Sequence, residues 1–195
     1  MKSTYDIFLK TILKDIVPHT KKAIKDGNKV FGAAILNKKD CSLVCIGINN
    51  ETKNPLLHGE ISTLNSFFKI PSKLRPNPKD CFFLSTHEPC SLCLSAITWT
   101  GFDNFYYLFG YNDTKNKFNI PHDLNILKEV FKINNGKYNK KNKYWKSLSI
   151  MDYSKKLAEP KKTIFIKEIN KVSRVYNKLS SLYQKKKKEI FIPLK

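Results

Sequence analysis

The sequence predicts an α/β sandwich, in which helices pack against a sheet. Short apolar runs bounded by turn residues are typical of buried strands, and up to Phe109 they alternate with segments whose apolar residues recur at helical spacing. The chain has 195 residues, of which 41% are hydrophobic, and this is enough for one compact domain with a sizeable core. The same composition excludes a disordered chain.

The elements are predicted in the following order. Apolar residues at helical spacing over 5–26 predict a first helix, which Pro18 breaks or kinks. Two apolar runs, 30–36 and 42–48, flank the polar turn 37–40 and predict a hairpin of two strands. The alternation then continues through a helix over 58–68, a strand over 81–86, a helix over 90–99 and a strand over 105–109.

The pattern changes after Asp123, where strand-like runs give way to helical and polar segments. The predicted segments are a short helix over 124–131, an exposed lysine-rich stretch over 134–143, and helices around 144–157 and 167–187. We therefore divide the chain into a core domain, residues 1–131, and a helical C-terminal extension, residues 132–195.

The net charge of +20 has two interpretations. A basic protein can bind nucleic acid through the phosphates. Alternatively, the charge reflects a composition rich in lysine and asparagine, which AT-rich coding sequences produce whatever the function. Lysine is spread along the whole chain and is not gathered in one stripe, so the compositional interpretation is favoured. Nucleic acid is kept as a partner that is not favoured.

The sequence indicates a soluble, cytoplasmic protein without a membrane partner. No apolar run approaches the length that spans a bilayer. The N-terminal residues 1–6 lack the basic and then apolar layout of a signal peptide. The five cysteines are an odd number without a secretory context, so free thiols or metal ligands are expected in place of a disulfide framework.

Two short motifs carry the chemistry. One residue separates His58 from Glu60, and a Pro-Cys-x-x-Cys segment follows with Cys90 and Cys93. One imidazole and two thiolates suit zinc, and three protein ligands leave the fourth tetrahedral position to water. Glu60 is not needed as a ligand, and beside the metal it is placed to move protons. The pattern H-x-E followed by P-C-x-x-C is that of zinc deaminases of nucleobases, so Zn²⁺ is the expected cofactor.

The two motifs are informative together and weak singly. Each stands at a predicted helix start, and helix N-termini favour the thiolate state. The expected reaction is hydrolytic: water adds to the ring carbon that bears the amino group, ammonia leaves and a carbonyl remains. An alternative of another class is a non-catalytic zinc module that binds nucleic acid. Such a module has no need of Glu60 beside an open metal position.

The stretch 30–109 resembles the cytidine deaminase-like superfamily. Segment 31–34 looks like the first strand of the branch that holds nucleoside deaminases, guanine deaminase, fungal cytosine deaminase and tRNA adenosine deaminase. Segment 58–64 looks like the helix of fungal cytosine deaminase, and 86–90 looks like the same stretch of nucleoside and tRNA deaminases. The resemblance implies a three-layer α/β/α fold with a mixed sheet, a homodimer, and catalysis by the core domain.

The same resemblance implies a set of substrate-binding residues. They are the ring of Phe31, the side chain of Asn49, the backbone of Gly59 and Glu88, His87 and Asp113. Several have a structural alternative. Asn49 can form a turn with Asn50, which could itself be the equivalent residue, and Phe31 can be a core aromatic. His87 can be a structural histidine, and Asp113 an exposed turn residue.

The favoured substrate is a free nucleobase or nucleoside of cytosine or guanine type. The tRNA enzymes usually have His-Ala-Glu, whereas Gly59 stands in this chain. In addition, His87 replaces the leucine that is common before the Pro-Cys segment. Adenosine deamination in tRNA is therefore the second hypothesis.

Overall fold

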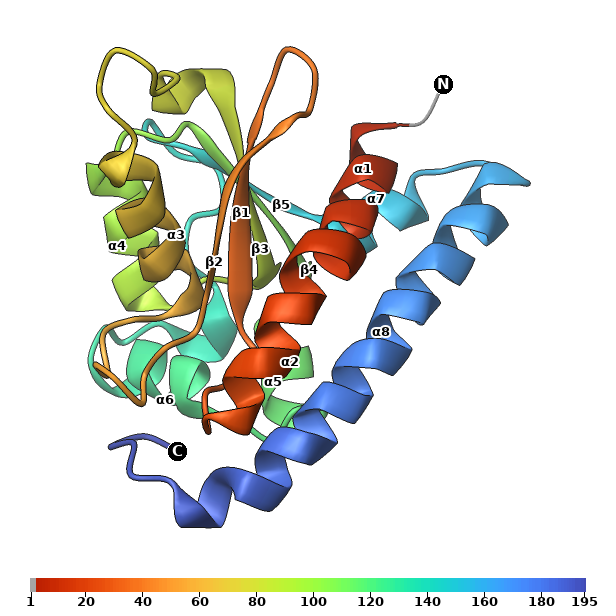
Figure 1. Ribbon diagram of the computed structural model, residues 1–195. Helices are drawn as coiled ribbons and strands as arrows, with labels where there is room; N and C mark the ends of the chain where they lie inside the picture. The colour runs from red at the N-terminus through yellow and green to blue at the C-terminus, as the bar shows by residue number, and fades with distance from the viewer. Residues whose placement is uncertain (1–2) are drawn as a thin grey trace.

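A mixed sheet forms the centre of the protein in the computed structural model, which describes residues 3–195 (Figure 1). Its strands are β1 (Gly32–Asn37), β2 (Leu43–Ile48), β3 (Cys81–His87), β4 (Asn104–Phe109) and β5 (Lys146–Ser149). They lie in the order β2-β1-β3-β4-β5. β1 is antiparallel to β2 and β3, whereas β3–β4 and β4–β5 are parallel pairs. Met1 and Lys2, which belong to the segment without a signal-peptide layout, lie outside the described residues.

Helices cover both faces of the sheet, so the predicted α/β fold with a mixed sheet is confirmed (Figure 1). One face carries α3 (Gly59–Lys69) and α4 (Ser91–Trp99), and the other carries α1 (Thr4–Thr11), α2 (Val17–Lys25) and α8 (Lys161–Lys186). Successive side chains of a strand point to opposite faces. In β1, Ala33 and Ile35 therefore belong to the core under α3 and α4, whereas Ala34 and Leu36 belong to the core under α1 and α8.

The remaining elements are short. They are α5 (Tyr111–Asn116), α6 (His122–Glu129), α7 (Ile150–Lys155), the 3₁₀ turns Pro78–Asp80, Asn134–Gly136 and Lys187–Glu189, and a π-helical turn Ile12–Ile16. The π-helical turn joins α1 to α2 and ends two residues before Pro18. Because proline has no N–H to complete the helical ladder, the predicted distortion of the first helix occurs in the turn that precedes it.

The helix predicted around 144–157 is found only in part, since β5 occupies residues 146–149 and only residues 150–155 are helical, as α7. β5 pairs in parallel with the edge of β4, and its sequence Lys-Ser-Leu-Ser lacks the apolar alternation that marks a strand. Ser149 then caps α7, because its Oγ accepts a hydrogen bond of 3.1 Å from the backbone N–H of Asp152. α5 was also not predicted from the sequence.

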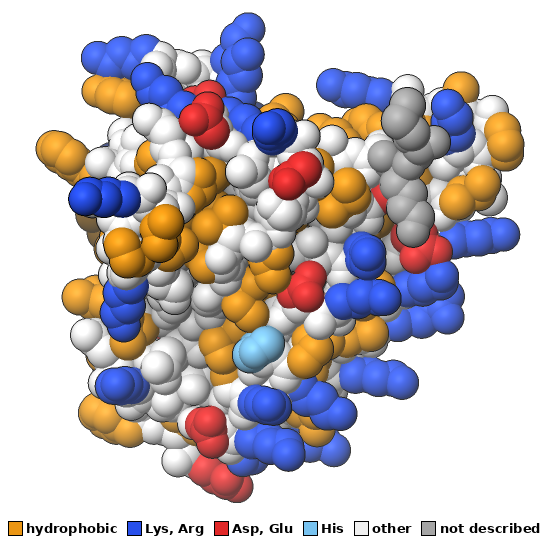
Figure 2. Space-filling model, turned by 45° about the horizontal axis from the view of Figure 1, so that its top comes forward, with side chains coloured by type: hydrophobic (Ala, Val, Ile, Leu, Met, Phe, Trp, Pro, Cys, Tyr) orange, Lys and Arg blue, Asp and Glu red, His pale blue; other side chains and the backbone are white. Residues whose placement is uncertain are grey.

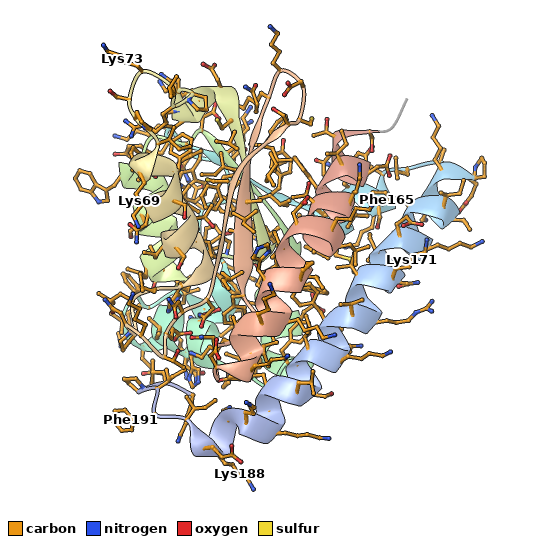
Figure 3. All side chains as sticks on the ribbon, in the orientation of Figure 1. Lys69, Lys73, Phe165, Lys171, Lys188 and Phe191 are labelled. Atoms are coloured by element: carbon orange, nitrogen blue, oxygen red, sulfur yellow. The ribbon has the colours of Figure 1, made fainter. Side chains whose placement is uncertain are left out.

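α8 packs against α1 and α2 and contributes to the core under them. Its inward side chains are buried, among them Phe165, Tyr176 and Tyr183, whereas Lys171 points away from the molecule (Figure 3). The division of the chain at residue 131 stays an interpretation of the sequence. In the structure, the segment after it supplies β5 to the sheet and α8 to the core.

The surface carries its charge in scattered positions. On the face shown in Figure 2, lysine and arginine side chains lie among carboxylates and apolar side chains, which agrees with the spread of lysine along the sequence. Among residues 3–195, no helix combines the length and the apolar character needed to cross a membrane.

Candidate active site

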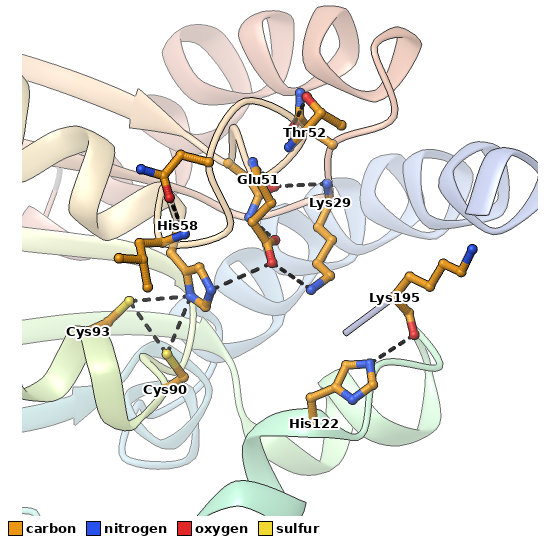
Figure 4. A network of polar contacts seen from close by, with 12 residues as sticks. Lys29, Glu51, Thr52, His58, Cys90, Cys93, His122 and Lys195 are labelled. Atoms are coloured by element: carbon orange, nitrogen blue, oxygen red, sulfur yellow. Dashed lines mark hydrogen bonds and ion pairs between the residues drawn. The ribbon is translucent and has the colours of Figure 1, made fainter. Parts of the chain in front are cut away.

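The three predicted zinc ligands meet where two helices begin. His58 is the N-cap of α3, Cys90 is the N-cap of α4, and Cys93 lies in the first turn of α4. His58 Nδ1 lies 3.4 Å from Cys90 Sγ and 3.7 Å from Cys93 Sγ, and the two sulfur atoms are 3.6 Å apart (Figure 4). Segments that are distant in the sequence therefore bring one imidazole nitrogen and two sulfur atoms together.

The spacing of these atoms fits zinc. In a tetrahedral site with Zn–S bonds of about 2.3 Å and a Zn–N bond of about 2.0 Å, two ligand atoms lie about 3.5–3.8 Å apart. The ligand atoms of His58, Cys90 and Cys93 all lie within 4.8 Å of one another. Both the donor set and its dimensions therefore suit a zinc ion with one position left open.

The charges of the cluster also favour a cation. The hydrogen bond from the Cys93 thiol and the neighbouring His58 imidazole lower the pKa of Cys90 well below its ordinary value, against the opposing effect of burial. Burial opposes protonation of His58, but Cys90, Glu51 and Glu60 together raise the pKa of its imidazole to about 9. Negative groups thus surround the position where a metal ion would lie.

Glu60 is buried in the first turn of α3, beside the ligands. Its Oε1 accepts a hydrogen bond of 2.7 Å from Ser85 Oγ on β3, and its Oε2 lies 3.3 Å from Cys93 Sγ. Burial raises the pKa of this carboxyl group above its ordinary value, and the adjacent Cys90 acts in the same direction. A carboxylate held in this way has one oxygen fixed and the other available at the metal position.

Gly59 allows α3 to begin directly against β1. A Cβ atom at this position would lie 2.8 Å from Gly32 Cα and 3.0 Å from the carbonyl carbon of Phe31. Both distances are shorter than van der Waals contact between carbon atoms. An alanine, as in the tRNA enzymes, would require the strand or the helix to shift.

His87 ends β3 and lies in a buried cluster of aromatic rings. Thr86 Oγ1 donates to the carbonyl oxygen of Gly32 at 2.9 Å and accepts from its N–H at 3.1 Å. The 2.9 Å contact between Thr86 Oγ1 and His87 Nδ1 therefore requires the histidine to donate. Nε2 is left as an acceptor with no hydrogen-bond partner in residues 3–195. Burial lowers the pKa of His87 to about 3, so the ring is neutral near pH 7.

A narrow space at the metal position is bordered by residues from several elements. They are Phe31, His58, Glu60, His87, Glu88, Cys90 and Asp123. The ligands His58 and Cys90 border this space. So do four residues that the sequence predicted for catalysis or substrate binding, namely Phe31, Glu60, His87 and Glu88. Asn49 borders neither this space nor the larger cavity beside it, because its side chain is bonded to Lys29 and Glu51.

Glu88 and Asp113 share a second cavity, of about 250 Å³. Glu88 Oε1 accepts hydrogen bonds of 2.8 Å from Tyr138 and Lys140. Asp113 caps α5 by accepting from the backbone N–H of Gly110 at 3.1 Å, and pairs with Lys117 at 2.6 Å. Asp113 does not border the narrow space at the metal position, and it lies at the helix start that follows β4.

The larger cavity beside the metal ligands has a volume of about 250 Å³. Mostly apolar side chains of α6, of the loop before α3 and of the C-terminal segment line it. In that segment Ile192 is only 3% exposed, and the carbonyl oxygen of Lys195 accepts a hydrogen bond of 3.0 Å from His122 Nε2 (Figure 4). The end of the described chain thus forms a wall of this cavity.

Asp123 is a residue of this site that the motifs did not indicate. It lies in the first turn of α6 and borders both the narrow space and the larger cavity. Burial, followed by the effect of Cys90, raises its pKa well above the ordinary value. None of the ion pairs within residues 3–195 involves its carboxylate. In the sequence, an acid at a helix start is typical of a helix cap, so it gave no signal of a site.

Comparison with known proteins defines the class of the molecule. Residues 8–109, just over half of the chain, match the family described as "cytidine and deoxycytidylate deaminase zinc-binding region". The chain belongs to this family of zinc-binding deaminases, with His58, Cys90 and Cys93 as its zinc site.

Individual relatives cover part of the chain. It is 32% identical to a cytosine deaminase of Candida albicans over 92 residues, which are 46% of this chain and 59% of that protein. It is 31% identical to a guanine deaminase of Bacillus subtilis over 85 residues, or 43% of this chain and 52% of that protein. The matched region thus spans somewhat more than half the length of these relatives.

Solved structures support the same fold. The guanine deaminase of Bacillus subtilis superposes with a TM-score of 0.52 and 25% identity, covering 68% of this chain and 85% of that chain. A guanine deaminase from Nitrosomonas europaea gives a TM-score of 0.50 at 14% identity, with 89% and 81% covered.

Proposed function

We propose that the protein is a zinc-dependent hydrolytic deaminase that converts the exocyclic amine of a free nucleobase or nucleoside, of cytosine or guanine type, to a carbonyl. The observation that carries this proposal is Glu60. Its Oε2 lies beside the ligand cluster, while Ser85 holds its Oε1 at 2.7 Å. A zinc site that served only to stabilise the fold would gain nothing from a buried carboxylate in this place.

The reaction assigns Glu60 the proton transfers. The chemistry that zinc supplies when bound is a water molecule of lowered pKa. With zinc bound, Glu60 Oε2 would take a proton from the attacking water and deliver it to the ring nitrogen of the base; it would then take the proton of the hydroxyl group added to the ring carbon and pass it to the departing amine. Ser85 keeps the carboxylate facing the metal position during both transfers. Ammonia and the carbonyl product balance the base and the water consumed.

The size and chemistry of the cavity support a small substrate. A volume of about 250 Å³ accommodates a nucleobase or a nucleoside. Phe31 offers an aromatic surface and Asp123 an acceptor for the N–H groups of a base. We assign Asp123 to substrate recognition on this basis, with His87 Nε2 as a second acceptor at the narrow space.

Two further proposals concern the state of the protein. We propose a homodimer, which is supported by exposed apolar side chains on α4, among them Trp99 at 89% exposure and Leu92 at 38%. We also propose a cytoplasmic location, which is supported by Cys90 and Cys93 as metal ligands, since a reducing compartment keeps thiols available for a metal.

The test is ammonia release from a panel of cytosine, guanine, adenine, their nucleosides and unmodified tRNA. The expected result is turnover of a cytosine- or guanine-type base or nucleoside, abolished by a chelator and restored by Zn²⁺. Turnover of tRNA alone would contradict the proposed substrate and favour adenosine deamination in tRNA. No turnover by protein that contains one zinc per chain, with any of these compounds, would contradict the enzymatic proposal.

A further inference from the structure

The second nitrogen of the zinc ligand His58 has a partner of its own. Because Nδ1 faces the two sulfur atoms, Nε2 points to the opposite side of the ring. There it lies 3.7 Å from Oε1 of Glu51 (Figure 4). Glu51 lies in the loop between β2 and α3, seven positions before the ligand, and no motif includes it.

The carboxylate of Glu51 is buried and has partners at both oxygens. The side chain is 4% exposed. Its Oε1 accepts from Lys29 Nζ at 2.8 Å, and its Oε2 accepts from Asn49 Nδ2 at 2.5 Å. A buried carboxylate requires such compensation, since desolvation of an unpaired charge is unfavourable. Lys29 is equally buried, with 5% of its side chain exposed.

The backbone around Glu51 is fixed by a second set of hydrogen bonds. Asn49 Oδ1 accepts from the backbone N–H of Lys29 at 3.1 Å and from that of Glu51 at 3.4 Å. Asn28 Oδ1 accepts from the N–H and the hydroxyl of Thr52, both at 3.0 Å. The segment before β1 is thus bound to the loop after β2, and the carboxylate is held in place before any metal binds.

We propose that Glu51 is the positioning residue of the zinc ligand His58, and that Lys29 and Asn49 hold Glu51 for this purpose. A carboxylate near Nε2 favours the tautomer that carries its hydrogen there, which leaves the Nδ1 lone pair directed at the metal position. It also makes the imidazole a stronger donor to a cation. Lys29 offsets the charge of Glu51 within the protein, so the carboxylate orients the ring without adding a full unpaired charge to the site.

This inference rests on the zinc site of the proposed function but is independent of the substrate. Its test therefore measures metal binding and not turnover. The variants are Glu51→Gln and Glu51→Ala. The matched control is Asp103→Asn, which also removes a carboxylate paired with a lysine, Lys38 at 2.7 Å, but borders neither of the spaces beside the metal ligands.

Zinc affinity is measured by competition with a chromogenic chelator, and the thermal midpoint of the metal-free protein is measured in parallel. Both Glu51 variants are expected to bind zinc roughly 10–100-fold more weakly than the original protein, whereas Asp103→Asn keeps the original affinity. Equal zinc affinity of all four proteins would overturn the inference. So would a loss of affinity in Asp103→Asn as large as that in Glu51→Gln, since it would reflect general destabilisation.

A second measurement covers the case in which the Glu51 variants do not fold. In the zinc-loaded original protein, the Nε2 proton of His58 is expected to exchange slowly with water in ¹⁵N-edited NMR spectra, because the buried carboxylate shields and holds it. Exchange as fast as that of free imidazole would overturn the inference. Failure of the original protein to bind zinc at all would instead contradict the proposed function.

Discussion

The two walls of the site differ in how their polar groups are engaged. The metal wall consists of His58, Glu60, Cys90 and Cys93 at the starts of α3 and α4. The outer wall consists of α6 and the C-terminal segment around Ile192. On the metal wall each functional atom lies within 3.7 Å of another polar group of the wall or of Ser85. On the outer wall the Asp123 carboxylate takes part in none of the ion pairs within residues 3–195.

This difference separates two tasks. Groups that perform chemistry must keep a fixed geometry, which a dense network provides. Groups that recognise a substrate must keep hydrogen-bonding capacity for it, and an unpaired carboxylate in an apolar cavity does so. The metal wall is therefore expected to determine the rate for every substrate, and the outer wall to determine which substrate is accepted.

Asp123→Asn is the substitution that tests most directly whether the two walls have different roles. The variant keeps the size of the side chain but replaces one carboxyl oxygen by an NH₂ group, so we expect kcat/KM for the preferred base to fall about 10–100-fold, the cost of leaving one hydrogen-bonding group of the base without a partner. Zinc content and the thermal midpoint should stay close to those of the original protein. If kcat/KM is unchanged for every base in the panel, Asp123 does not contact the substrate. The outer wall would then only enclose the cavity, without recognising the base.

His87 gives a prediction on stability. Its pKa is about 3 in the folded protein and about 6.5 in the unfolded chain. The unfolded state therefore takes up a proton as pH falls below 6.5, and the folded state is progressively destabilised down to about pH 3. Between pH 6.5 and 5 this costs about 2 kcal/mol.

His87→Leu should remove this part of the acid sensitivity. Urea unfolding of both proteins at pH 7 and pH 5 measures it, and only the difference between their pH dependences is compared, because other groups titrate in both. An equal loss of unfolding free energy in the two proteins would mean that His87 is not buried in its neutral form.

The smallest effect is expected from salt. A free base has no phosphates, so kcat/KM should change by less than about twofold between 50 and 200 mM salt, whereas a substrate held by 6–10 phosphate contacts would lose about 10³–10⁵ in affinity. A steep fall with salt would assign the charge of +20 to nucleic acid binding. It would also mean that residues outside the cavity recognise the substrate.

The metal wall could be predicted from the sequence because its residues fall in two short motifs at helix starts. Local spacing is enough to place such ligands. The outer wall could not be predicted in this way. Asp123 and Ile192 approach His58 only through tertiary packing, and neither belongs to a pattern with a chemical meaning. Glu51 could not be predicted from the sequence either, since a single acidic residue in a loop has no local signature.

Among the helices and strands, too, some could be predicted from the sequence and others could not. β1 is buried on both faces, and its continuous apolar run predicted it. α8 has a long helical repeat of apolar residues and was predicted for the same reason. β5 was missed because its four residues include a lysine and two serines, so that its pairing with β4 and not its composition makes it a strand.

The central claim is that Glu60 moves the protons of a deamination at this zinc site. The most direct test is the rate of ammonia release by Glu60→Gln, measured on the preferred base with protein that contains one zinc per chain. Loss of a general acid and base is expected to lower kcat at least about 10²–10⁴-fold, with zinc affinity and fold retained. A variant that holds zinc and keeps the original kcat would contradict the claim.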